Sequence, residues 1–278
     1  MTSKILFGTA GIPLSTSKPS TITGIERVKE LELHAMELEF VRGVNMKKET
    51  AKQVKKTAEK NEISLSVHGP YYINLNSKET TKQEASIKRI FDSAEAGEWC
   101  GAKAITFHPG FFQGMLKEKV TQTIQKNLEI VLEQLKQHKI VAKIKPETTG
   151  KPTQYGSLTE LLELYSAVPA IKPYVDFAHV HARDNGRFKT KENVRNALEE
   201  IEKNDAHLLK DLNMHFSGIA FSEKGEKNHL VLQDSTNTFP YKWVLECLKE
   251  FDVHGTVICE SPNIEKDALL LQKYYEKL

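Results

Sequence analysis

The chain has 278 residues, of which 39% are hydrophobic and 27% charged, and its formal net charge is +2. These values predict a globular protein with a large core, and the balanced charge is no evidence by itself for a nucleic-acid partner, although it allows a local basic face. No stretch approaches the roughly 18 apolar residues of a membrane span, and the first apolar run is too short for a signal peptide. Cys100, Cys247 and Cys259 form no CxxC pair, so we expect reduced thiols, a cytoplasmic location and no membrane partner.

Short apolar segments rich in β-branched residues alternate with longer amphipathic segments along the whole chain. In chain order, the predicted strands are 4–10, 35–41, 64–69, 104–110, 141–150, 173–179, 212–219 and 255–262. The predicted helices are 21–33, 47–62, 79–99, 117–138, 157–168, 190–204, 240–251 and 264–277. Polar loops are expected after the strands that end at 179 and 219. Ser157, with Glu160 three residues later, and Asn263 are expected to cap the helices that follow them.

Strict alternation of strands and helices predicts a parallel sheet with helical crossovers. Eight such units in a chain of this length predict an α/β fold, a closed (β/α)8 TIM barrel that forms a single domain over residues 1–278. The Lys- and Glu-rich helices are expected to be the solvated outer layer of the barrel.

Six consecutive predicted strands end in a metal-ligating type of side chain. These residues are His68, His108, Glu147, Asp176, His215 and Glu260. In a barrel the carboxyl ends of the strands converge on one rim, where active sites lie. His179, three residues after Asp176, and His229, in the loop after the strand that ends at 219, are further candidate ligands.

Each of these residues alone has an ordinary interpretation. A lone His at a strand end is more often a hydrogen-bonded turn residue, and a lone Asp or Glu is often a helix cap. Three carboxylates crowded on one rim are costly, however, unless a cation neutralises them. His with Asp or Glu is a ligand set that zinc accepts. We therefore expect two or three metal ions with a bridging carboxylate such as Glu147, an arrangement suited to phosphodiester hydrolysis.

The motifs "SVHGPYYINL", "FHPG", "KPETTG", "DFAH", "MHFSG" and "ICESP", in this order, resemble the endonuclease IV family of abasic-site endonucleases, with archaeal members the most similar. The resemblance covers nearly the whole chain. It implies a zinc-dependent phosphodiesterase, acting as a monomer in base excision repair. Such an enzyme cuts double-stranded DNA on the 5′ side of an abasic site and leaves a 3′-hydroxyl and a 5′-deoxyribose phosphate.

The resemblance also implies how the ligands are shared. One zinc would be held by His68, His108 and Glu147, a second by Glu147, Asp176, His215 and Glu260, and a third by His179 and His229. Glu147 would bridge two ions and act in catalysis beside the attacking water.

The segment "GEKNHL" departs from the family pattern. Family members usually carry Asp two residues before the second histidine of the third site, and here that residue is Lys227. An ammonium group cannot ligate a metal, so Glu226, Glu223 or a water would have to replace the carboxylate. Alternatively, His229 is only a loop residue, and His181 is another possible neighbour of the site. We therefore expect two zinc ions and leave a third open.

Residues on the same rim are candidates for contacts with DNA. By resemblance, Tyr71 would insert into the duplex at the lesion, with Tyr72 beside it. Arg42 and Arg183 are candidate phosphate ligands, as are Arg187, Lys224 and Lys227, although each alone is more often an ordinary surface charge. Phe111 and Phe112 could line the groove or only pack, and Glu39 could lie behind the ligands or on the rim.

Two other functions remain open on the sequence alone. A metal-dependent sugar isomerase or epimerase would use the same barrel with a small closed pocket and no inserted aromatic residue. A DNA-lesion binder that has lost efficient catalysis would retain affinity for abasic duplex without cutting it, and Lys227 is the feature that favours it.

Overall fold

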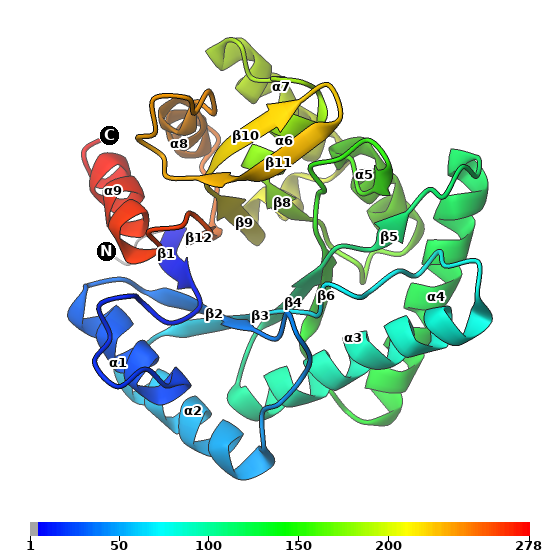
Figure 1. The fold of residues 1–278 in the computed structure, drawn as a ribbon, viewed down its shortest axis with the longest axis horizontal. Coiled ribbons are helices and arrows are strands. Elements are labelled where there is room, and N and C mark those ends of the chain that lie inside the picture. The colour runs from blue at the N-terminus through cyan, green and yellow to red at the C-terminus, as the bar shows by residue number, and fades with distance from the viewer. Residues whose placement is uncertain (1–4) are drawn as a thin grey trace.

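The computed structural model describes residues 5–278, which form a barrel of eight parallel strands surrounded by helices (Figure 1). The strand order is β6-β4-β3-β2-β1-β12-β9-β8. Isolated bridges pair Ile144 with Ile171 and Glu147 with Tyr174, so the two edge strands approach and the barrel is nearly closed. The strands are β1 (Ile5–Ala10), β2 (Ala35–Glu39), β3 (Ser64–His68), β4 (Ala104–Phe107), β6 (Lys143–Pro146), β8 (Tyr174–Asp176), β9 (Leu212–Phe216) and β12 (Gly255–Cys259).

The predicted helices form the outer layer of the barrel (Figure 1). They are α1 (Thr21–Glu30), α2 (Lys48–Asn61), α3 (Thr80–Cys100), α4 (Lys117–Gln137), α5 (Leu158–Ala167), α7 (Lys191–Asn204), α8 (Tyr241–Glu250) and α9 (Glu265–Glu276). In α2, for example, Ala51, Val54 and Ala58 are buried at helical spacing while the lysines between them are exposed. The predicted TIM-barrel fold is confirmed.

The two segments predicted as polar loops contain ordered elements, so the loop prediction holds only for residues 184–189 and 231–239, and residues 177–179, predicted as strand, are helical. The first is α6 (Phe177–Arg183), which begins directly after β8 because the Asp176 carboxylate accepts a hydrogen bond of 2.6 Å from the His179 backbone N–H. The second is the hairpin of β10 (Gly218–Ser222) and β11 (Gly225–Leu230). The hairpin lies across α6 at the mouth of the barrel (Figure 1).

Three shorter elements complete the described chain. The strands β5 (Gly110–Phe111) and β7 (Gln154–Tyr155) pair in an antiparallel ladder on the loops after β4 and β6. A 3₁₀ turn covers Ala206–Lys210 and precedes β9.

The predicted caps have different outcomes. Ser157 and Glu160 form a reciprocal capping box at the start of α5, as expected. Asn263 does not cap the last helix: its amide group bonds to the side chains of Ser261 and Asp267 instead. The chain enters α9 through Ile264, at φ 43°, which makes no side-chain cap.

Polar residues fill the barrel interior in layers. At the amino ends of the strands, the buried Lys145 ammonium donates to the Asp211 carbonyl and to Asn213. Glu37 occupies the next layer, and the predicted ligands lie above it at the carboxyl ends. The three cysteines are buried free thiols, as expected. Among residues 5–278, no helix is both long and apolar enough to span a membrane.

Candidate metal centre

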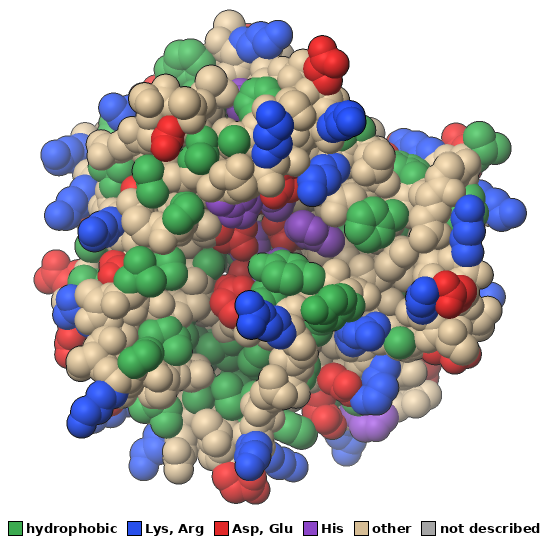
Figure 2. All heavy atoms as spheres, in the orientation of Figure 1, with side chains coloured by type: hydrophobic (Ala, Val, Ile, Leu, Met, Phe, Trp, Pro, Cys, Tyr) green, Lys and Arg blue, Asp and Glu red, His purple; other side chains and the backbone are tan. Residues whose placement is uncertain are grey.

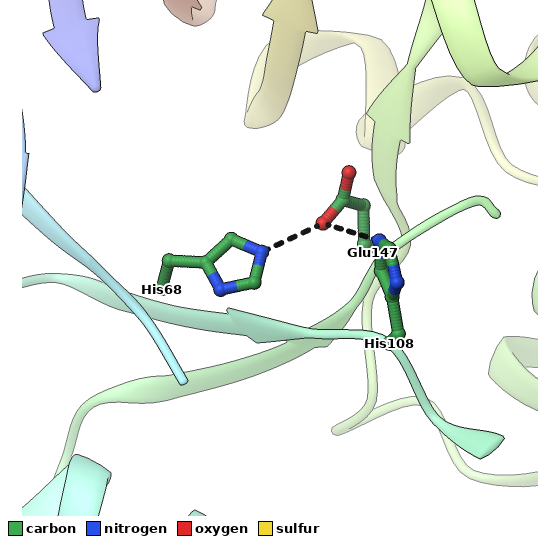
Figure 3. Close-up of side chains that lie close together, drawn as sticks. All are labelled: His68, His108 and Glu147. Carbon is green, nitrogen blue, oxygen red and sulfur yellow. Dashed lines mark hydrogen bonds and ion pairs between the residues drawn. The ribbon is translucent and has the colours of Figure 1, made fainter. Parts of the chain in front are cut away.

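Glu147 lies at the centre of the predicted ligand set. It follows β6 directly and is fully buried. Its Oε2 atom lies 3.2 Å from His68 Nε2 and 3.4 Å from His108 Nε2 (Figure 3). Its Oε1 atom lies 3.0 Å from His215 Nδ1 and 3.2 Å from His179 Nδ1. One carboxylate therefore contacts four imidazoles, which come from the end of β3, the residue after β4, strand β9 and helix α6.

The eight predicted ligands form three groups with donor atoms within 4.8 Å of one another. The groups are His68, His108 and Glu147; Glu147, Asp176, His215 and Glu260; and Asp176, His179 and His229. Glu147 and Asp176 each belong to two groups, so neighbouring metal ions would share carboxylates. Whether each residue binds a metal stays a prediction, but the structure brings all eight together.

These residues fit a set of divalent metals. Asp176 Oδ2 is buried and has no hydrogen-bond partner among the described residues, which is costly in a folded protein unless a cation faces it. The set consists of five imidazoles and three carboxylates, and both are donor types that zinc binds.

The imidazoles are held in the orientation that ligands need. In three of them, one ring nitrogen donates to a backbone carbonyl oxygen, which leaves the other nitrogen directed into the cluster. The pairs are His68 Nδ1 with Gly69 O at 2.8 Å, His179 Nδ1 with Thr148 O at 3.0 Å, and His229 Nδ1 with Glu260 O at 3.2 Å.

Sequence reasoning missed Glu37, which accepts a hydrogen bond from His215 and so orients its ring. Glu37 Oε1 lies 2.7 Å from His215 Nε2, and both side chains are fully buried. Ser66 Oγ donates to the other carboxylate oxygen at 2.7 Å, since residues 37 and 66 are register partners on β2 and β3. A signal existed in "MELEF", where Glu37 and Glu39 share one face of a strand that is otherwise apolar.

The electrostatics of the cluster are strongly coupled. Burial alone would raise the pKa of the Glu147 carboxyl, but the imidazoles of His215 and His108 outweigh it and hold that pKa well below its usual value. Burial likewise opposes the charge on His68, yet its hydrogen bond to Glu147 raises its pKa to about 10. Burial raises the pKa of the Asp176 carboxyl, although His179 opposes the shift. Carboxylates and imidazoles thus shift one another's pKa values at the barrel mouth, and such perturbed groups are common at functional sites.

An open cavity of about 600 Å³ lies above this cluster. It is lined by Glu39, His68, Tyr71, His108, Glu147 and Glu260, among others. Viewed onto this face, histidine and acidic side chains gather in a central hollow with hydrophobic and basic side chains around it (Figure 2). A substrate can therefore reach the ligand cluster from solvent.

The two predicted rim tyrosines differ in position. Tyr71 is 65% exposed and Tyr72 is 66% exposed, but only Tyr71 lines the cavity, with its ring edge-on to His68 at a centroid distance of 5.8 Å. The Tyr71 backbone N–H donates to the Val41 carbonyl at 3.0 Å, so the exposed Arg42 lies on the same part of the rim.

Arg183 has partners within its own chain. Its Nη1 atom lies 2.9 Å from Thr149 Oγ1 and 2.6 Å from the Lys151 carbonyl oxygen, and its side chain is only 9% exposed. Arg183 therefore braces the loop after Glu147, and its contact with DNA stays a prediction without support from this geometry. Arg187 is similarly paired with Asp184 and Glu200.

Of the two histidines on α6, only His179 faces the cluster. His181 accepts the Phe188 backbone N–H at 3.1 Å and packs among aromatic rings, including Phe221 and Phe239. Burial lowers its pKa to about 4, which makes His181 a neutral core residue.

The chain matches the family model described as xylose isomerase-like TIM barrel over residues 25–277. The chain belongs to this family. An uncharacterized protein of Methanocaldococcus jannaschii is 41% identical over 275 residues, which cover 99% of this chain and 98% of that protein. A protein of Aquifex aeolicus named as a probable endonuclease 4 is 29% identical over 204 residues, or 71% of each chain.

Solved structures with the same fold include enzymes of different types. Endonuclease IV from Thermus thermophilus superposes with a TM-score of 0.73 at 17% identity, covering 97% of this chain and 100% of that one. A D-tagatose 3-epimerase-like protein superposes with a TM-score of 0.72 at 19% identity, covering 98% and 96%. At these identities the superpositions establish the barrel and do not discriminate between the two chemistries.

Proposed function

We propose that this protein is a zinc-dependent abasic-site endonuclease that hydrolyses the DNA phosphodiester 5′ to the lesion. The observation that carries the proposal is the sharing of Glu147 and Asp176 among three adjacent groups of metal-ligand side chains under an open cavity. Clustered ions with shared carboxylates suit phosphodiester hydrolysis, in which both the attacking and the leaving oxygen need stabilisation. The sequence similarity to a probable endonuclease 4 supports the same conclusion.

In this proposal the eight ligands hold the ions and the rim holds the DNA. The chemistry that bound zinc supplies at such a cluster is activation of water and stabilisation of charge on phosphate oxygens. Glu147 fixes the relative positions of the ligands because its two oxygens contact four imidazoles. Tyr71 fills the space that opens at the lesion, and Arg42 faces the phosphate backbone. We expect the enzyme to act on double-stranded DNA as a cytoplasmic monomer.

Sugar epimerisation is the second candidate, and one observation favours it. Glu39 lines the cavity without belonging to any of the three ligand groups, so a carboxylate is available there for proton transfer. The exposed Tyr71 at the mouth and the open cavity favour a large substrate instead.

A lesion binder without catalysis stays the third candidate. It rested on Lys227, whose side chain is exposed on β11 and is not among the cavity-lining residues.

The test uses a duplex with one tetrahydrofuran abasic analogue, which blocks spontaneous β-elimination, and the same duplex without the lesion. We expect zinc-loaded protein to cut only the damaged strand, 5′ to the analogue, leaving a 3′-hydroxyl. Absence of incision across a zinc and manganese series, by folded protein, would contradict the proposal. Epimerisation of a ketohexose without affinity for the duplex would then identify the sugar enzyme, and tight binding without incision would identify the lesion binder.

A further inference from the structure

The hairpin at the barrel mouth delivers a second acidic group to the His179–His229 pair. Glu226 Oε2 lies 3.5 Å from His179 Nε2, and Glu226 Oε1 lies 4.0 Å from His229 Nε2. The two Nε2 atoms are themselves 3.3 Å apart. Three side chains from α6 and β11 therefore converge on one point at the edge of the cavity.

An irregularity in β11 produces this convergence. On β10 and β11, Ala220 pairs with Asn228 but Phe221 pairs with Glu226, so Lys227 is an extra residue in the ladder. In a regular strand, residues 227 and 229 would share a face and residue 226 would point away. The one-residue bulge reverses this alternation, since it leaves Glu226 on the face of His229. Lys227 and Asn228 are exposed, whereas the Glu226 side chain is only 18% exposed.

The loop after Glu147 is shaped to receive Glu226. The Glu226 backbone N–H donates to the Gly150 carbonyl at 2.8 Å. A Cβ atom at Gly150 would lie 2.6 Å from Glu226 Oε2, so any other residue at position 150 would displace the carboxylate. Gly225, at φ +87°, makes the turn that brings the hairpin onto this loop.

A buried carboxylate lies beside the same pair of imidazoles. Asp176 belongs to the ligand group of His179 and His229. Its Oδ2 atom lies 3.5 Å from His179 Nδ1 and has no hydrogen-bond partner among the described residues. Two imidazoles with two carboxylates form a complete four-ligand set for zinc.

We propose that Glu226 is the fourth ligand of a zinc site formed with Asp176, His179 and His229, and that the bulge at Lys227 aims it there. The inference rests on the proposed metal-dependent function and adds a ligand to it. It also removes the difficulty of a lysine two residues before His229, because the bulge turns that lysine outward.

Zinc stoichiometry tests the proposal directly. Wild-type protein, Glu226→Gln and Glu223→Gln would be equilibrated at buffered free zinc, and the bound metal measured by mass spectrometry. Glu223 is the matched control because it lies exposed in the turn of the same hairpin. We expect three zinc ions in the wild type and in Glu223→Gln, but two in Glu226→Gln, whose affinity for the third ion falls by about tenfold or more.

Deletion of Lys227 tests the role of the bulge. Removing the extra residue would make the ladder regular and place Glu226 two residues before His229, on the same face. We therefore expect the deletion variant to retain three zinc ions, and its circular dichroism would verify that it folds. Loss of the third ion from this folded variant would overturn the role assigned to the bulge.

Three other outcomes would overturn the ligand assignment. These are two ions in the wild type, three ions bound with wild-type affinity by Glu226→Gln, or equal losses in Glu226→Gln and Glu223→Gln. Incision of the abasic duplex by wild-type protein is measured separately. A protein that binds the third ion through Glu226 but cuts no DNA would refute the proposed function alone.

Discussion

Glu37 Oε1 and His215 Nε2 form a fully buried hydrogen bond of 2.7 Å beneath the predicted metal ligands. Because Nε2 donates to this carboxylate, Nδ1 is the nitrogen that faces Glu147 and Glu260. Glu37 thus sets the tautomer and the ring orientation of one predicted ligand without facing the cavity.

We predict that Glu37→Gln weakens zinc binding by about tenfold, and Glu37→Leu by more, since glutamine retains an acceptor oxygen but no charge. Competition with a chromophoric chelator measures this affinity. Ser66→Ala is the matched control, because it removes one hydrogen bond to the same carboxylate and leaves its charge. Equal affinities in Glu37→Leu and the wild type would show that His215 does not depend on Glu37.

Tyr71→Ala should reduce kcat/KM for the abasic duplex by about 5- to 150-fold, the range expected when a stacking contact of about 1–3 kcal/mol is lost. The reason is its position over the cavity beside His68. Tyr72→Ala is the control, since Tyr72 is equally exposed but does not line the cavity. Kinetics with the tetrahydrofuran duplex measure both variants, and a larger loss in Tyr72→Ala would contradict the assignment.

Removal of bound zinc should destabilise the protein. A ligand at 100 times its Kd stabilises the folded state by about 2.7 kcal/mol, so chelation should lower Tm by about 5 °C or more for a protein of this size. Zinc should restore the original Tm and magnesium should not, because nitrogen donors do not suit magnesium. An unchanged Tm after verified metal removal would mean that the cluster binds no metal tightly.

Asp211 offers a pH-dependent test at the other end of the barrel. Its carboxylate lies 2.7 Å from Lys143 Nζ, 3.1 Å from Lys172 Nζ and 3.5 Å from the buried Lys145 Nζ. Burial would raise the pKa of Asp211, but the Lys145 ammonium and the other two lysines outweigh it and lower that pKa to about 2. We predict that Asp211→Asn lowers the free energy of unfolding by about 1–3 kcal/mol at pH 7, a figure reduced for the partial exposure of this carboxylate.

The sign of the pH dependence follows from the lowered pKa. The folded protein binds a proton at Asp211 less readily than the unfolded chain, so the stabilisation is complete above about pH 4 and is lost as pH falls towards 2. Urea unfolding of metal-free wild type and Asp211→Asn should therefore converge in this range. Asp92→Asn is the control, because Asp92 pairs with the exposed Lys88 of the same helix. This substitution should change the free energy of unfolding by less than about 0.5 kcal/mol. A constant difference between wild type and Asp211→Asn from pH 7 to pH 2 would contradict the lowered pKa.

Much of the fold and of the ligand cluster follows from the sequence for a simple reason. Alternation of apolar strands with amphipathic helices is a local pattern, and it requires a parallel sheet with crossovers. Once eight strands form a barrel, topology alone brings strand-end residues such as His68 and Glu260 together. No long-range contact had to be predicted to place them.

The features that sequence analysis missed depend on local irregularity or on packing. The bulge at Lys227 reverses the alternation of β11, and nothing in "GEKNHL" marks it, so the sequence left Glu226 as only one of several alternatives. Arg183 was a candidate for DNA contact because a long cation after a strand end is usually exposed, but its partners in the loop after Glu147 arise only in the folded barrel. Glu37 lies within a strand, where a charged residue is uncommon.

The most direct test is single-turnover incision of the tetrahydrofuran duplex by zinc-loaded wild type and Glu147→Gln. The two proteins would be matched in fold by circular dichroism. Because Glu147 contacts four imidazoles with its two oxygens, we predict incision 5′ to the analogue by the wild type and a rate at least about 100-fold lower for Glu147→Gln. Equal rates, or no incision by the fully loaded wild type, would contradict a Glu147-centred endonuclease.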